Sequence, residues 1–179
     1  MPGAGAALMS MLTVVVLCDG MRVYLQRNVV RRHAVEICGS VLIGSVFSLF
    51  FTAHLAAALQ LSPEIARSLL PRSITVALAL PMTQMLGGIE SLTTAMVCAT
   101  GLVGAALGQL FLGAVRMQDE ISRGVAQGSC SHGLGASAMA ATEPQALPFC
   151  AVTIAIMGTV SNVLLCVPYI RTALLAVTG

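Results

Sequence analysis

Residues suited to binding chemistry occur in two short polar stretches within otherwise apolar sequence. The first, "LPRSIT", places Arg72, Ser73 and Thr75 directly after Pro71. Pro71 suits the first turn of a helix, and the free N–H groups at a helix start attract anions. The Arg72 guanidinium could add two parallel hydrogen bonds to a carboxylate. The stretch therefore predicts an anion-binding helix start; the alternative is that Arg72 only extends to the membrane surface.

The second stretch, "GVAQGSCSHGLGASAMAAT", contains Ser129, Ser131 and His132 among glycines and alanines. Glycines such as Gly133 allow a backbone to approach a ligand closely. His132 titrates near neutral pH, so it could bind a carboxylate or carry a proton; the alternative is a neutral histidine that hydrogen-bonds between helices. The candidate substrate-binding residues are therefore Arg72, Ser73, Thr75, Ser129, Ser131, His132 and Gly133.

The overall composition is that of a helical membrane protein. Hydrophobic residues make up 57% of the 179 residues and charged residues 9%, and the mean hydropathy is +0.92. A soluble domain carries about 25% charged residues. Residues 34–59, 91–115 and 146–170 are each longer than the roughly 20 apolar residues needed to cross a bilayer. We predict an all-α, multi-pass membrane protein with one domain over residues 1–179 and five or six membrane segments.

Charge and cysteine content narrow the class further. Arginines 22, 27, 31 and 32 precede the first long span, which predicts that this loop faces the cytoplasm or an equivalent compartment. Plastid, mitochondrial and plasma membranes all remain open. The cysteines contain no CxxC pair and indicate small packing residues. The sequence predicts no enzyme activity, no cofactor, no metal site and no nucleic-acid partner.

Three apolar segments, 4–20, 71–89 and 124–142, are interrupted by small residues or proline. The middle one contains Pro81, Gly87 and Gly88. In lipid, a broken helix persists only where protein or water covers its freed backbone groups. Transporters place such helices at their substrate sites. Each interrupted segment could either cross the membrane or turn back.

The order of segments suggests an internal repeat. Residues 13–19 resemble 75–81 at an offset of 62, and this offset also maps Gly39 onto Gly101. Residues 61–69 resemble 117–125 at an offset of 56, with a weaker third copy over 129–170. Repeated interrupted segments indicate a transport site. The second offset pairs Glu64 with Glu120, Arg67 with Arg123 and Ser73 with Ser129.

Most small residues have a packing interpretation. Gly124 and Gly128 form a close-packing pattern for membrane helices. Glu36 and His54 are expected near the membrane interface, and Asn162 is expected to hydrogen-bond between helices. In the interrupted segments 71–89 and 124–142 and at the residue before the second, the residues predicted to have structural roles are Pro71, Pro81, Gly87, Gly88, Arg123, Gly124, Gly128 and Gly135.

Residues 69–108 and 123–135 resemble the LrgB/CidB family. The first match is carried by Pro71-Arg72-Ser73-Ile74-Thr75 and Gly87-Gly88-Ile89, and the second by Arg123, Gly124, Gly128, Ser131, His132 and Gly135. The chain departs from the family pattern at Arg72, usually Lys, and at Ala136, usually Thr. Family members have further spans upstream, so the resemblance implies that this chain is short at its N-terminus.

The resemblance implies a transporter of small carboxylates such as glycolate, glycerate and pyruvate, with a proton as one option for the coupled ion. It also implies an LrgA-like membrane partner or a missing N-terminal half, beside membrane lipid. A homo-oligomer is another option. Two alternative functions stay open: a holin-like or antiholin-like pore that modulates lysis, and a partner subunit or truncated remnant without transport activity.

Overall fold

The computed structural model describes Val14, Leu17, Cys18, Gly20, Met21 and residues 23–179. All regular elements in this part are helices, which confirms the predicted fold class. Three of them are long and apolar enough to cross a membrane: α3 (Ala34–Ala58), α6 (Glu90–Ala114) and α8 (Leu147–Cys166). The predicted interrupted segment 4–20 falls largely outside the described residues. The remaining helices are α2 (Arg27–Arg32), α4 (Pro63–Leu69), α5 (Val76–Leu86), α7 (Glu120–Thr142) and α9 (Pro168–Thr178).

A 56-residue repeat runs through the spans as well as the polar turns. Helix α3 begins at 34 and ends at 58, and α6 begins at 90 and ends at 114. Both end in the same turn, in which Gln60 (φ 52°) and Arg116 (φ 56°) occupy the left-handed region. The backbone N–H of Leu61 bonds Ala56 across this turn, and that of Met117 bonds Leu112, both at 3.1 Å or less. The predicted offset of 62 is therefore wrong for the spans: Gly39 corresponds to Ala95 and not to Gly101.

Helix α7 is two half-helices that fold back on each other, here called hairpin 2 (residues 120–142). The backbone breaks at His132, where φ is 39° and ψ is −138°. Arg123 Nε donates to Glu143 Oε2 over 2.6 Å, although residues 20 apart in a continuous helix are separated by about 30 Å. A Cβ added at Gly135 would lie 3.0 Å from Gln127 Nε2. The segment therefore leaves the membrane on the side it entered.

The equivalent segment of the first unit, residues 63–86, also folds back and is here called hairpin 1. It consists of α4, an irregular stretch over 70–75 and α5. Ser68 Oγ accepts the Ile89 N–H over 2.7 Å, so the end of α5 returns to the level of α4. Gly87 closes α5 with φ 72°, a conformation that favours glycine. Gly88 contacts the backbone of Ser68, where an added Cβ would lie 3.0 Å from the Ser68 nitrogen.

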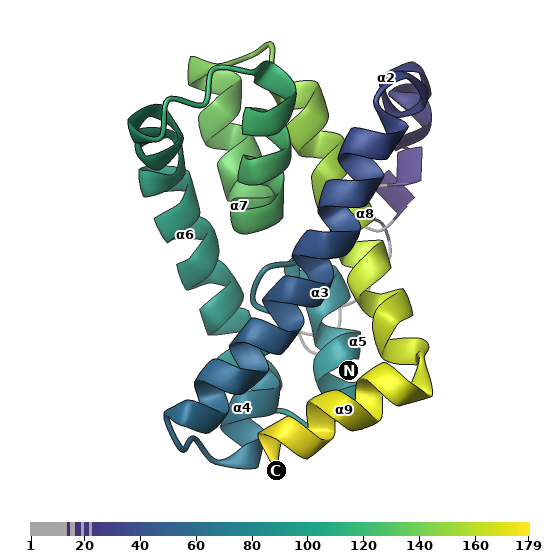
Figure 1. Cartoon of the computed structure of the whole chain (residues 1–179), viewed down its shortest axis with the longest axis vertical. Helices are drawn as coiled ribbons and strands as arrows, with labels where there is room; N and C mark the ends of the chain where they lie inside the picture. The colour runs from purple at the N-terminus through teal and green to yellow at the C-terminus, as the bar shows by residue number, and fades with distance from the viewer. Residues whose placement is uncertain (1–13, 15–16, 19, 22) are drawn as a thin grey trace, which may run out of the picture.

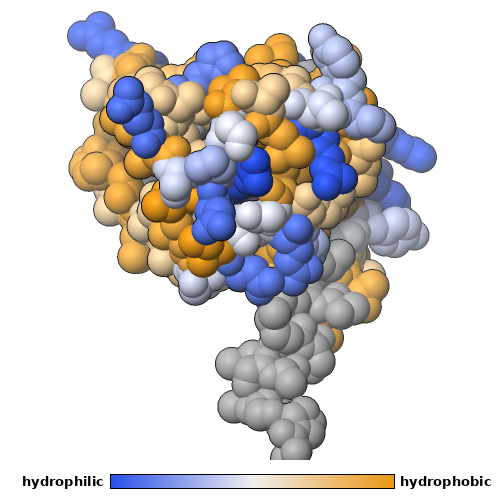
Figure 2. Space-filling view, turned by 90° about the horizontal axis from the view of Figure 1, so that it is seen from below, coloured by the Kyte–Doolittle hydropathy of each residue, from blue (hydrophilic) through white to orange (hydrophobic). Residues whose placement is uncertain are grey.

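The two hairpins enter the molecule from opposite ends (Figure 1). Each unit contains one span followed by one hairpin that turns back, so the second unit has the opposite orientation to the first. Hairpin 1 lies at the end of the molecule that carries α4 and α9, here called the α4 end. Hairpin 2 lies at the opposite α2 end. Seen from the α4 end, hydrophilic residues lie over the middle of the face and at several places on its edge, interspersed with hydrophobic ones (Figure 2).

Helix α8 packs between the two units and ends earlier than the apolar run predicts. It stops at Cys166 because Val167 is extended (φ −77°, ψ 113°) before Pro168, as the residue before a proline usually is. Pro168 then starts α9, which crosses the α4 end (Figure 1). The main core joins α3, α5, α8 and α9 through Val41, Ala79, Met82, Val152 and Leu174, all buried.

Candidate functional site

The tips of the two hairpins reach the same depth, halfway along α8. An added Cβ on Gly128 of hairpin 2 would meet Thr153 of α8 at 2.9 Å. Leu78 of hairpin 1 accepts a hydrogen bond from Asn162, one turn beyond Gly158 on α8, over 3.2 Å. Because the hairpins approach from opposite ends, their tips converge between these two levels.

The tip of hairpin 1 is held against α3 by two hydrogen bonds. Arg72 Nε donates to Thr52 Oγ1 over 3.1 Å, and the Ser73 and Ser48 hydroxyls are 3.0 Å apart. Arg72 and Ser73 are half-buried. Thr75 Oγ1 is buried and has no hydrogen-bond partner among the described residues. The tip therefore presents a cation and an unpaired hydroxyl in the interior of the protein.

Both hairpins place a helix start at this depth. The first N–H groups of α5 and of the second half of α7 have no partner within their helices. The positive ends of two helix dipoles thus converge there. In hairpin 2, the first half-helix ends at the same tip and opposes this field. In hairpin 1, residues 70–75 are not helical, so the field of α5 is not opposed and Arg72 adds to it.

His132 occupies the tip of hairpin 2 but its ring lies against α6. Its Nε2 is 2.9 Å from the Val97 carbonyl; a carbonyl only accepts, so Nε2 carries the proton in this bond. An added Cβ on Gly101 would lie 2.8 Å from the same nitrogen, which shows how closely the ring packs. The backbone of His132 has a positive φ, which is uncommon for a non-glycine residue. The ring therefore anchors the tip and leaves Nδ1 for other partners.

The other predicted residues of hairpin 2 divide into packing and open positions. Ser131 is buried, donates to Gln127 of its own helix over 2.7 Å and packs against Gly104. Gly124 and Gly128 contact α8, where an added Cβ would clash with backbone atoms of Ala146 and Cys150. In contrast, Gly133 is exposed and a Cβ there would meet no described atom within 4 Å.

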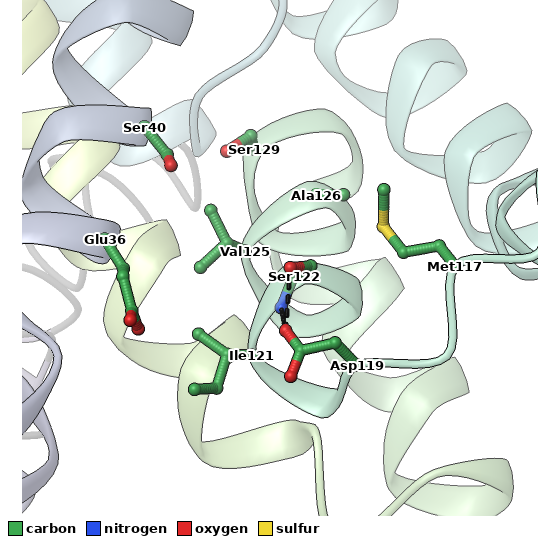
Figure 3. A pocket seen from close by; sticks show the side chains of 9 residues that line it. All are labelled: Glu36, Ser40, Met117, Asp119, Ile121, Ser122, Val125, Ala126 and Ser129. Atoms are coloured by element: carbon green, nitrogen blue, oxygen red, sulfur yellow. Dashed lines mark hydrogen bonds between the residues drawn. The ribbon is translucent and has the colours of Figure 1, made fainter.

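An open cleft leads from the α2 end to the tip of hairpin 2 (Figure 3). It has a volume of about 590 Å³ and lies between α3 and the first half of α7. Glu36 and Asp119 lie toward its mouth, whereas the Ser40 and Ser129 hydroxyls turn toward each other at its inner end (Figure 3). Two hydrogen bonds from Ser122 hold the pKa of Asp119 below its usual range.

A polar row on α3 connects the cleft with hairpin 1. It consists of every fourth residue, and such rows wind slowly around a helix. The upper residues, Glu36 and Ser40, line the cleft, and the lower ones contact Ser73 and Arg72. An added Cβ at Gly44, between them, would meet no described atom within 4 Å. The row was not predicted, although its members are four residues apart in the sequence: Glu36, Ser40, Gly44, Ser48 and Thr52.

Arginines occupy equivalent positions at the bases of the two hairpins, and the one in hairpin 2 forms an ion pair. Arg123 pairs with Glu143 and also donates to the Met117 carbonyl over 2.8 Å. The hydrogen bond from Arg123 holds the pKa of Glu143 below its usual range. Arg67, 56 positions before Arg123, lies beside Gly87, where an added Cβ would be 3.9 Å from its Nη1. Pro81 lies inside α5.

The predicted site residues thus gather around one region, with different roles. Arg72, Ser73 and Thr75 form one side, and Ser129 and Gly133 lie at the open side of hairpin 2. Ser131 and His132 are nearby but directed into packing contacts. These features define a helical membrane protein of two inverted units, each with a hairpin that turns back within the membrane.

Comparison with known proteins gives the family. The LrgB-like family model matches residues 3–170, so the chain belongs to the LrgB-like family. It is 46% identical over 179 residues to plastidal glycolate/glycerate translocator 1 of Arabidopsis thaliana, covering 99% of this chain and 35% of that protein. It is 34% identical over 133 residues to YwbG of Bacillus subtilis, covering 74% of this chain and 59% of YwbG. YxaC of the same organism is also 34% identical, over 128 residues, covering 72% of this chain and 56% of YxaC.

The chain therefore spans about a third of the plant translocator and less than 60% of the two bacterial relatives. No solved structure matches it.

Proposed function

We propose that this chain forms the substrate-binding core of a membrane transporter for small carboxylates of the glycolate, glycerate and pyruvate class. The observation that carries the proposal is the convergence of two helix starts, Arg72 and the unpaired Thr75 hydroxyl at the tips of two opposed hairpins. Helix starts bind anions, and transporters with inverted repeats bind substrates where broken helices meet. The name of the plant relative, a glycolate/glycerate translocator, supports the same substrate class.

The asymmetry of the dipoles predicts where the carboxylate binds. Hairpin 1 supplies Arg72 and an unopposed helix start, whereas hairpin 2 supplies Ser129 and open backbone at Gly133. The carboxylate is therefore held by hairpin 1, and the rest of the substrate faces hairpin 2. His132 holds the tip of hairpin 2 through its Nε2, and its Nδ1 binds and releases the coupled proton.

The cleft beside hairpin 2 would admit the substrate from the α2 end. The inverted repeat supplies the second state: an opening between α6 and hairpin 1, at the positions 56 residues away from those of the cleft. There, Leu92 and Met96 occupy the places of Glu36 and Ser40, and Ser73 occupies that of Ser129. Rocking of one unit against the other alternates access in such folds.

Uptake into proteoliposomes tests this function. The wild-type chain would be reconstituted alone and with an LrgA-like partner, and uptake of glycolate, glycerate and pyruvate measured with and without a pH gradient. The test variant is Arg72→Gln. The control is Arg116→Gln, because the repeat already has glutamine at the equivalent position, Gln60.

We expect saturable uptake by the wild type and by Arg116→Gln, and a loss of about 10- to 100-fold in Arg72→Gln, since a hydrogen bond to a charged group contributes about 1.5–3 kcal/mol. Unsaturable leakage limited only by solute size would instead support the pore alternative. Equal uptake by Arg72→Gln and wild type would refute the assigned site. Absence of uptake in both preparations, with correct insertion, would refute the transporter assignment.

A further inference from the structure

A second cavity lies at the α2 end, next to the cleft: His33 lines this cavity, and its hydrogen-bond partner Glu36 lines the cleft. It has a volume of about 650 Å³ and shares no lining residue with the cleft. It is formed where α2 joins α3 and where α8 begins. The transport proposal uses none of its residues: Asn28, Val29, Arg31, Arg32, His33 and Phe149.

The lining combines hydrogen-bond donors with an apolar wall. Arg31 and Arg32 contribute two guanidinium groups and Asn28 an amide. His33 Nδ1 lies 2.8 Å from Glu36 Oε2, so the Glu36 carboxylate already has a hydrogen-bond partner. The His33 and Phe149 rings meet edge to face, with their centroids 5.7 Å apart. The cavity therefore has a cationic rim beside an apolar surface.

The position of the cavity relates it to the membrane surface. His33 directly precedes α3, and Phe149 lies in the first turn of α8. Both helices are long enough to span the bilayer, so their starts lie at the depth of the lipid headgroups. Arg27, Arg116 and Arg123 are at the same end, and only Arg67 and Arg171 of the described arginines lie at the other. Basic pockets between membrane helices on the positive side bind anionic headgroups.

We propose that this cavity binds the phosphate of an anionic phospholipid. The guanidinium groups of Arg31 and Arg32 and the Asn28 amide hold the phosphate, because arginine forms paired bonds with phosphate oxygens. Val29 and Phe149 contact the glycerol and acyl region of the same lipid. This apolar wall distinguishes a lipid from free phosphate, which has no group to place there. The proposal does not depend on the transport function.

Thermal unfolding of the purified full chain in non-ionic detergent tests the site. Phosphatidylglycerol, phosphatidylcholine and inorganic phosphate would each be titrated, and the unfolding midpoint followed. The test variant is Arg31→Gln/Arg32→Gln. The control is Arg27→Gln, because Arg27 lies on the same helix but packs over Tyr24, 4.8 Å from its ring centroid, and does not line the cavity. Asn28→Leu serves as a second test that leaves all charges in place.

We expect phosphatidylglycerol alone to raise the midpoint of the wild type and of Arg27→Gln. Each arginine near an anionic surface strengthens binding about fivefold, so the double variant should bind about 25-fold more weakly. Asn28→Leu should bind phosphatidylglycerol at least about threefold more weakly than the wild type. An equal rise with phosphatidylcholine or inorganic phosphate would overturn the proposal. The same lipid affinity in the double variant, or in Asn28→Leu if the double variant does not fold, would also overturn it.

Discussion

The close packing of His132 against α6 leads to a specific prediction for Gly101→Ala. The new methyl group would lie 2.8 Å from His132 Nε2 and 3.0 Å from Leu134 Cδ1, both closer than ordinary contacts. Overfilling a packed site costs about 1–3 kcal/mol, and loss of the bond from His132 to Val97 costs about 1 kcal/mol more. We therefore expect Gly101→Ala to destabilise the protein by about 3 kcal/mol.

The matched control is Gly113→Ala on the same helix, where an added Cβ meets no described atom within 4 Å. Alanine there should stabilise α6 by about 0.5–1 kcal/mol. Far-UV circular dichroism of the chain in detergent would record thermal unfolding. For a chain of this length, 1 kcal/mol corresponds to about 2–4 °C, so Gly101→Ala should unfold about 6–12 °C below wild type. Unfolding at or above the temperature of Gly113→Ala would refute the placement of His132.

Three further predictions concern the hairpins. Arg123→Gln should lower the free energy of unfolding at neutral pH by about 1.5–3 kcal/mol. The pKa of Glu143 is lowered below 4.5 in the folded protein, so the stabilisation by this pair is present above about pH 4.5 and is lost in acid. The unfolding curves of the variant and the wild type should therefore converge as the pH falls. Thr75→Val should reduce the uptake of glycolate and of acetate alike by about 3- to 10-fold, because Thr75 belongs to the hairpin that holds the carboxylate, whereas Thr159→Val, whose hydroxyl bonds its own helix, should not; unchanged uptake would separate Thr75 from the carboxylate. Asn162→Leu removes the bonds to Leu78 and Gly158, at 3.2 and 3.0 Å, and should lower the unfolding midpoint by several degrees; an unchanged midpoint would contradict the proposed link between α8 and hairpin 1.

The spans and their interruptions were predictable from the sequence because they depend on local properties. Apolar runs define α3, α6 and α8, and the proline and glycines around 71 and 87 locate the turns of hairpin 1. The direction of each hairpin was not predictable. A chain rich in small residues can continue or fold back, and that outcome depends on contacts such as Arg123–Glu143 across 20 residues.

In the candidate site, too, residue types were predictable from the sequence, whereas side-chain orientations were not. The residue types around Arg72 and His132 marked two polar stretches, but chemistry alone gave both the same role. The orientation of the His132 ring toward Gly101 depends on a packing contact with a glycine 31 positions earlier. The polar row on α3 went unnoticed because its serines are separated by apolar residues, and serines in membrane helices usually have packing roles.

The inverted repeat also has a consequence for biosynthesis. Two units with the same architecture insert into the membrane in opposite orientations, so neither the span nor the hairpin by itself determines orientation. The bias must come from the flanking charges, and the cluster before α3 is the strongest in the chain. Once α3 is anchored by these arginines, its orientation dictates that of each later unit.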